Sequence, residues 1–140
     1  MTEKYKILGK YIKDMSSETP NIETYIMVKE RILKYKLEID IKSKVLKDKL
    51  IEIDITFKFK DREEVKKKSY FEIVYSSIVK IIDENMKKDD LEKILLCEVP
   101  VKIYPSIEKA LTNLLNDSGY PDVKFDKAVD FEKLYERRIN

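Results

Sequence analysis

Apolar and polar residues alternate strictly in two neighbouring stretches of the chain, residues 33–42 and 51–60. The apolar positions are Leu33, Tyr35, Leu37, Ile39 and Ile41 in the first stretch, and Ile51, Ile53, Ile55, Phe57 and Phe59 in the second. Because strand side chains point alternately to opposite faces, both stretches predict β-strands with one apolar and one solvated face. The polar link between them is too short for a crossover helix, so we expect an antiparallel hairpin.

Two further strands are predicted on either side of this pair. Residues 69–79 follow a charged turn and place Phe71, Ile73 and Tyr75 on one face, opposite Tyr70 and Glu72. Residues 5–15 predict a first strand that ends before Pro20, because proline removes a ladder donor. Residues 22–31 lack clean periodicity, so we expect a crossover segment with partly exposed apolar groups.

Beyond residue 82 the apolar residues take helical spacing. We expect one helix that Pro100 ends, and a longer one through residues 103–115 that Gly119 caps in a left-handed conformation. A last short helix follows, with Asp130 as its N-cap. Strands followed by helices predict a single α+β domain over residues 1–140, in which a four-stranded antiparallel sheet is backed by helices.

The composition excludes much active-site chemistry. The 140 residues include 29 basic and 27 acidic ones, no histidine, one cysteine (Cys97) and two glycines (Gly9 and Gly119). A nucleophile with a histidine base, a zinc site, an internal disulfide and a glycine-rich phosphate loop all lack their residues. We therefore expect no enzyme activity, no metal and no cofactor.

The chain gives no sign of a membrane segment or a signal peptide. Its longest uncharged runs, residues 73–79 and 110–116, are far shorter than the roughly 20 residues that a membrane helix needs. Residues 1–16 mix charged with apolar side chains, where a signal peptide needs a continuous apolar block. We expect a soluble cytoplasmic protein.

A lysine-rich sheet that binds nucleic acid is one functional alternative. Such a sheet needs aromatic and basic side chains on one face, so that bases stack beside phosphate contacts. Here Tyr35, Phe57 and Phe59 alternate onto the aliphatic face, and acidic residues such as Glu38 and Asp54 share the lysine face. This mixture favours a partner other than nucleic acid.

Several short motifs resemble the SecB family of protein-export chaperones. The run Lys-Asp-Met-Ser-Ser-Glu-Thr-Pro-Asn at residues 13–21 is similar to the end of that family's first strand. Pro-Val-Lys-Ile-Tyr-Pro at residues 100–105 is similar to its helix start, and Phe-Glu-Ile at residues 71–73 falls at its apolar-Glu-Val strand. The motifs occur in the family's order along nearly the whole chain.

The resemblance implies an ATP-independent holdase that binds unfolded precursor proteins and passes them to the motor protein SecA. It also implies a homotetramer built as a dimer of dimers, and no cofactor. The family's SecA-docking surface corresponds to Asp14, Glu18, Tyr70 and Glu72.

Two features depart from the export chaperones. The net charge is +2, whereas those proteins are acidic, and the chain ends soon after its last predicted helix, without the polar tail of many relatives. Both features favour an alternative, a SecB-like chaperone that protects the antitoxin of a toxin–antitoxin system.

A holdase needs exposed apolar groups, and the chain offers two sets of candidates. We expect client binding by large apolar side chains of the crossover, the second strand and the last helix: Tyr25, Ile26, Met27, Leu33, Tyr35, Phe125, Phe131 and Leu134. We expect the subunit interface to include apolar residues of the fourth strand and the long helix: Phe71, Ile73, Tyr75, Ile107 and Leu111.

Overall fold

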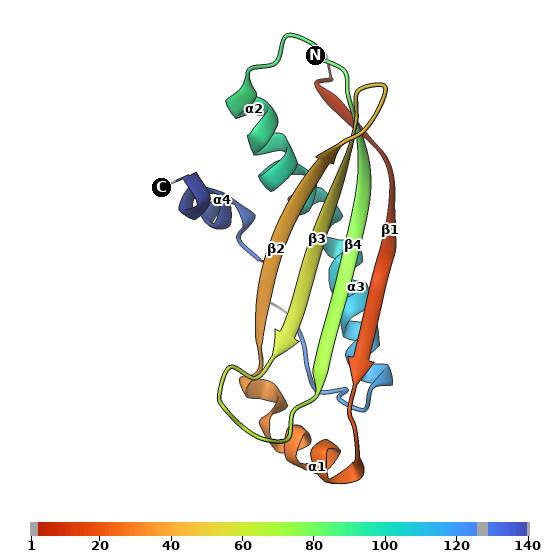
Figure 1. Ribbon diagram of the computed structural model, residues 1–140, viewed down its shortest axis with the longest axis vertical. Coiled ribbons are helices and arrows are strands. Elements are labelled where there is room, and N and C mark those ends of the chain that lie inside the picture. The colour runs from red at the N-terminus through yellow and green to blue at the C-terminus, as the bar shows by residue number, and fades with distance from the viewer. Residues whose placement is uncertain (1–2, 126–128, 140) are drawn as a thin grey trace.

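A computed structural model describes residues 3–125 and 129–139 and shows an elongated sheet with helices on one face (Figure 1). The strands are β1 (Tyr5–Glu18), β2 (Lys36–Val45), β3 (Leu50–Lys60) and β4 (Tyr70–Ile81). They form one sheet in the order β1-β4-β3-β2, and all neighbours are antiparallel. The predicted α+β class and four-stranded antiparallel sheet are confirmed, and β1 and β2 form its two edges.

The inner face of the two central strands carries the core. Along β3 every second side chain is buried, and the pattern continues into β4. Ile53, Ile55, Phe57, Phe71 and Ile73 are fully inaccessible to solvent. The strict alternation of the sequence therefore decides which face of the sheet meets the helices.

One helical stretch crosses this inner face diagonally (Figure 1). It comprises α2 (Lys88–Lys93), a π-helical turn η2 (Ile94–Glu98) and α3 (Val99–Asp117), which follow one another directly. At η2 it lies beside β2, where Leu96 and Ile41 line the same hollow. At its end it reaches β1, where the Ser118 and Ser17 hydroxyls are 2.6 Å apart. No helix in the described parts of the chain is long and apolar enough to cross a membrane.

Pro100 does not end a helix, contrary to our expectation. The residues that flank η2 keep right-handed helical angles, and the Val99 amide donates to the Ile94 carbonyl across the wide turn. Proline lacks an N–H, and its ring crowds the carbonyl four residues earlier, which is that of Leu96. The helix accommodates Pro100 by widening this turn, as π-bulges do.

The crossover is a regular helix and not an aperiodic segment. It consists of α1 (Ile22–Arg31) and a 3-10 turn η1 (Ile32–Lys34). The Asn21 side chain caps α1 by accepting from the Thr24 amide at 2.9 Å. Leu33 lies in η1, so the second strand begins at Lys36, three residues later than the alternation predicts.

Both predicted caps at the C-terminal end of the chain are confirmed. Gly119 has a φ of 100°, its amide donates to Asn116, and the Tyr120 amide donates to Leu115, which is the Schellman pattern. The last helix, α4 (Phe131–Ile139), begins after Asp130, whose side chain accepts from the Lys133 amide at 3.1 Å.

Replacing Gly119 by alanine is expected to lower the free energy of unfolding by at least about 1–2 kcal/mol, the cost of a left-handed L-residue. A Cβ at Gly119 would also lie 2.7 Å from a ring carbon of Tyr25. Urea denaturation measures the loss.

Gly9→Ala is the matched control, because a Cβ at Gly9 would meet no atom within 4 Å. Equal stability of the two variants would contradict the role assigned to the Gly119 cap.

Candidate binding surfaces

A row of three adjacent hollows follows the inner side of the edge strand β2. The first, of about 220 Å³, lies between Leu33, Leu37 and Phe125. The second, of about 570 Å³, shares Leu37 and extends to Leu134. The third, of about 320 Å³, shares Leu134 and ends at Leu96, which belongs to η2. We call this row the β2 groove; its lining includes β2 residues from Lys36 to Ile41.

Exposed apolar side chains lie on the helix α1 and on the turn η1, which lead into β2. Ile26 is 56% exposed, Met27 43% and Leu33 74%, as the crossover prediction required. Leu33 lines the first hollow itself. Tyr25 is partly buried, because it packs on Tyr120 with ring centroids 5.4 Å apart.

Two predicted client-binding residues lie in the core instead. Tyr35 is 4% exposed and packs against Phe59 and Phe71, and its hydroxyl accepts from the Ser69 amide at 3.2 Å. Phe131 is 1% exposed and packs on Tyr104. Both are apolar groups that the sheet needs for its own packing, so the structure corrects these two assignments.

Phe125 and Leu134 are partly buried and line the groove. Phe125 borders the first hollow and meets Phe59 edge to face at 5.4 Å. Leu134 borders the second and third hollows from α4. Their placement agrees with a binding surface that is continuous with the core.

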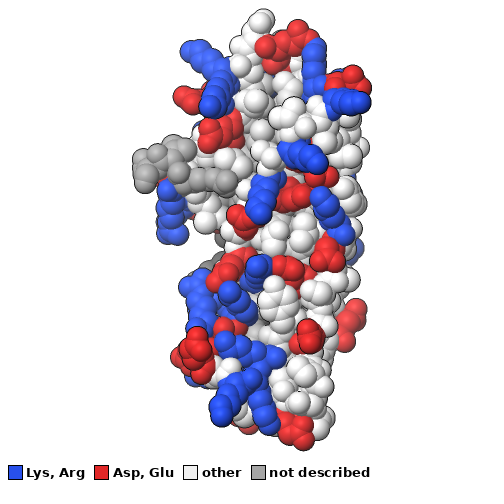
Figure 2. Space-filling model, viewed as in Figure 1, with Lys and Arg blue, Asp and Glu red and all other residues white. Residues whose placement is uncertain are grey.

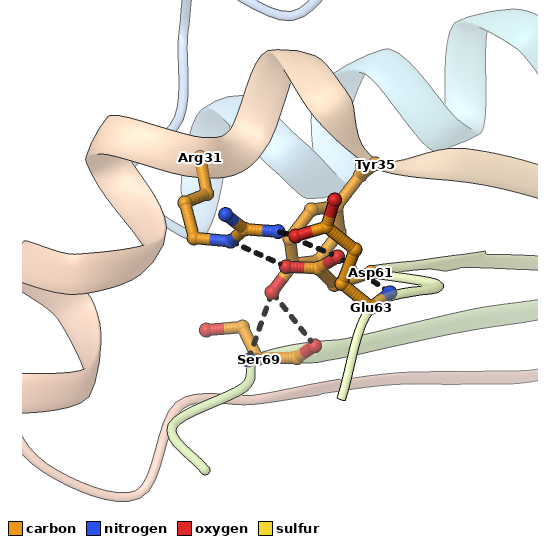
Figure 3. A network of polar contacts seen from close by, with 5 residues as sticks. All are labelled: Arg31, Tyr35, Asp61, Glu63 and Ser69. Carbon is orange, nitrogen blue, oxygen red and sulfur yellow. Dashed lines mark hydrogen bonds and ion pairs between the residues drawn. The ribbon is translucent and has the colours of Figure 1, made fainter. Parts of the chain in front are cut away.

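An ion-pair network fastens the end of α1 to the end of β3 (Figure 3). Arg31 holds Asp61 with two hydrogen bonds, at 2.7 and 3.0 Å, and Glu63 with a third at 2.8 Å. The Arg31 guanidinium lowers the pKa of Asp61 below its ordinary value. Sequence reasoning missed this clamp; the only signal was an arginine in a chain whose cations are mostly lysines.

A second tie joins α1 to the end of α3. The Tyr25 hydroxyl donates to the Gly119 carbonyl at 2.9 Å, and its ring covers the space where a Cβ of residue 119 would lie. The helix α1, which leads directly into η1 and the first hollow, is therefore held from two sides.

The predicted docking residues lie together on the outer face of the sheet. In the β1–β4 register Glu18 is opposite Tyr70, and Asp14 lies four residues earlier on the same strand, opposite Val74. Glu72 accepts a hydrogen bond from the Tyr70 hydroxyl at 3.2 Å and lies 3.8 Å from the Lys58 amine. Figure 2 shows acidic and basic side chains interspersed over this face. The acidic side chains therefore share one face of the sheet, and lysine side chains such as that of Lys58 lie among them.

The residues expected at a subunit interface are buried within the single chain. None of them is more than 7% exposed: Phe71, Ile73, Tyr75, Ile107 and Leu111. They pack between the sheet and α3, and Tyr75 also borders the surface hollow beside β1, so the assignment is corrected for the other four. The stripe that α3 shows in the sequence serves the fold of one subunit.

The exposed apolar surface lies instead at the β1 edge. Tyr11, Ile12 and Met15 are more than two-fifths exposed, and Ile12 and Met15 share a hollow of about 440 Å³ with α3. β1 pairs with β4 on one side only. Sequence reasoning missed this surface, because strand order decides which strand becomes an edge.

The described residues bear on three other kinds of site: a metal site, a reactive cysteine and a surface for stacking nucleic-acid bases. Residues 3–125 and 129–139 contain no group of three or more His, Cys, Asp or Glu side chains placed to hold a metal ion. Cys97 is buried, and burial raises the pKa of its thiol, which favours the protonated form. Phe57 and Phe59 are buried, so they offer no stacking surface to nucleic acid.

This fold is that of the SecB-like chaperones. A solved SecB-like chaperone of Mycobacterium tuberculosis, in complex with a peptide from an antitoxin, has a TM-score of 0.66 to this chain. The likeness covers 90% of this chain and 91% of that one, at 9% sequence identity.

Sequence comparison then identifies the family. The family model of preprotein translocase subunit SecB matches residues 1–140, so the chain belongs to the SecB family. A Pelagibacter ubique relative that carries the SecB name is 54% identical over 140 residues, which is the full length of both chains. A protein-export protein SecB of a Bradyrhizobium species is 27% identical, over 95% of this chain and 80% of its own length. Membership supports a SecB-type chaperone role.

Replacing Asp61 by asparagine is expected to lower the free energy of unfolding near neutral pH. The difference from the wild type is expected to be smaller in acid. The folded-state pKa of Asp61 is lowered from 3.8 mainly by hydrogen bonds from Arg31. Its carboxylate therefore stabilises the fold above the unfolded-state pKa, and this contribution is lost as pH falls through the folded-state pKa. Urea denaturation of the wild type and the variant at about pH 7 and about pH 2.5 measures the difference in the free energy of unfolding at each pH.

Glu63→Gln is the comparison within the clamp and should destabilise the protein less, because the Glu63 side chain is 70% exposed while that of Asp61 is 3% exposed. The Arg31 clamp would be refuted by an Asp61→Asn variant as stable as the wild type near neutral pH.

Proposed function

We propose that this chain is an ATP-independent holdase that binds non-native polypeptides along the β2 groove. The observation that carries the proposal is the row of apolar hollows beside β2, with Leu33 exposed at its end. Large exposed apolar side chains are costly in water unless a partner covers them. The family to which the chain belongs consists of chaperones, which agrees with this reading.

Binding without nucleotide hydrolysis relies on many weak contacts. Burial of one large apolar client side chain contributes roughly 1.5–3 kcal/mol, so a few hollows suffice for useful affinity. Deformable side chains such as Met27 suit clients of varied sequence. Several grooves in one assembly raise the effective concentration of the remaining segments of the same client.

The assembly that supplies these grooves is a homotetramer, arranged as a dimer of dimers. Its support here is the β1 edge, which has open pairing capacity on one side and exposes Ile12 and Met15 beside α3. A second copy that covers this surface would bury its apolar side chains and would satisfy the strand edge. The β2 groove lies on the opposite edge and stays open.

Delivery of precursor proteins to SecA completes the proposal. Curated relatives are named protein-export proteins, and Asp14, Glu18, Tyr70 and Glu72 lie together on the outer sheet face. An antitoxin is the alternative client. The mixed charge of that face and the net charge of +2 favour it. The export chaperones are acidic, and both features weaken the long-range attraction of this chain to a basic partner surface.

The wild-type protein is expected to have a solution mass near four times 16.7 kDa and to suppress aggregation of a denatured client at less than one tetramer per client. Leu33→Glu is expected to weaken client binding about tenfold, because it places a charge in an apolar hollow. Light scattering measures the mass and the aggregation, and fluorescence titration measures the affinity.

Val45→Glu is the matched control, since Val45 is 78% exposed and lies at the far end of β2 from Leu33. A monomer without aggregation suppression would sink the holdase proposal.

The double charge reversal Asp14→Lys with Glu18→Lys is expected to abolish SecA binding and to leave client binding unchanged. These side chains lie on the outer sheet face, away from the β2 groove. Interferometry with immobilised SecA measures the first effect, and the aggregation assay measures the second.

Asp89→Lys with Asp90→Lys makes the same charge change in the first turn of α2 and should retain SecA binding. If the wild type ignores SecA but protects an antitoxin, the antitoxin alternative is supported instead.

A further inference from the structure

The β2 groove combines an apolar floor with a rim of positive charge. Each of its three hollows is bordered by at least one cation: Lys36 and Lys124 at the first, Arg62, Lys133 and Arg137 at the second, and Arg137 again at the third. The hollow beside β1 is bordered by one cation, Lys109, and one acid, Asp117, whereas the lining of the β2 groove holds five cations and three acids. The positive rim is therefore a property of this groove, although the chain as a whole is nearly neutral.

Most of the acidic groups in the groove already have partners. The Glu38 carboxylate lies 3.2 Å from the Lys60 amine. Asp130 accepts the Lys133 amide as the cap of α4. Asp40 lies 4.0 Å from Lys42, in an exposed pair that gives little screening.

The cations of the rim are not neutralised in the same way. Within residues 3–125 and 129–139, the side chains of Lys36, Arg62, Lys124 and Arg137 make no ion pair or hydrogen bond. Cations beside a low-dielectric apolar floor attract an anion more strongly than they would in open water. The groove therefore presents charge that a ligand could complement.

The same sign of charge continues past the first hollow. Residues 29–36 contain four cations and one acid, and the connection from β3 to β4, residues 61–69, contains four cations, among them the run at residues 66–68, and three acids. In Figure 2 basic side chains gather at the lower end of the view, where Figure 1 places α1 and this connection. A bound segment that leaves the groove at this end enters a positive field.

We propose that the β2 groove selects polypeptide segments in which acidic residues flank an apolar core. The apolar core would fill the hollows at Leu37 and Leu134, and the flanking carboxylates would meet Lys36, Lys124 and Arg137 at the rim. This inference rests on the proposed holdase function and specifies its substrate class. Nucleic acid fits less well, because the strand aromatics Tyr35 and Phe59 that line the first hollow are buried and offer no open face for stacking.

The test uses three labelled peptides with one apolar core and with acidic, neutral or basic flanks, titrated onto the full-length protein. Fluorescence anisotropy at about 50 mM and about 500 mM salt gives the dissociation constants. The acidic-flanked peptide is expected to bind about tenfold more tightly than the basic-flanked one at low salt, and the ratio should shrink at high salt. A single-stranded oligonucleotide serves as competitor.

The double variant Lys36→Glu with Lys124→Glu is expected to reduce or reverse the preference, while Lys87→Glu with Lys88→Glu, at the exposed start of α2, should retain it. Equal binding of all three peptides by the wild type would overturn the charge preference and leave the holdase function standing. Failure of every peptide to bind would overturn both. Displacement of the peptides by the oligonucleotide at low concentration would overturn the inference in favour of nucleic acid.

Discussion

A single helical stretch is too narrow to cover a four-stranded sheet, and this mismatch shapes the molecule. A helix with its side chains is about 10–12 Å wide, whereas strands lie about 4.8 Å apart, so one helix covers roughly two strands. Here the stretch from α2 to α3 seals β3 and β4, whose inner side chains are inaccessible to solvent. The edge strands are left with partly open apolar faces. The β2 groove and the hollow beside β1 are therefore what one diagonal helix leaves uncovered.

The two open edges suit different tasks because different elements border them. The β1 edge lies beside the regular surface of α3 and exposes Ile12 and Met15 in a row, a geometry that a symmetric copy can match. The β2 edge is bordered by η1, by residues 123–125 and by α4, which leave hollows of unequal size. Uneven hollows with a charged rim suit clients that share a chemical character but no sequence.

The sheet could be predicted from the sequence because period-two alternation is a local signal that tertiary packing reinforces. The caps at Gly119 and Asp130 were equally local. The α1 helix was not found, because its exposed face keeps Ile26 and Met27, which obscures the apolar periodicity, although Asn21 is a favourable N-cap residue. The assignments of Tyr35, Phe131 and four of the interface residues were wrong for another reason. Apolar character predicts that a side chain is buried, but it does not show whether the same chain or a partner buries it. That Asp14 and Glu72 share the outer sheet face was expected only through family motifs, since the two lie far apart in the sequence, and their docking role stays a prediction.

The two fastenings of α1 have a thermodynamic consequence for binding. Arg31 ties one end of the helix to Asp61, and the Tyr25 hydroxyl ties its middle to Gly119. A helix held in this way also fixes η1, which borders the first hollow, so this end of the groove gives up little conformational freedom when a ligand arrives. The entropy lost on association then falls almost entirely on the incoming chain. Clients that are already extended should accordingly associate more favourably than clients that must first shed residual structure.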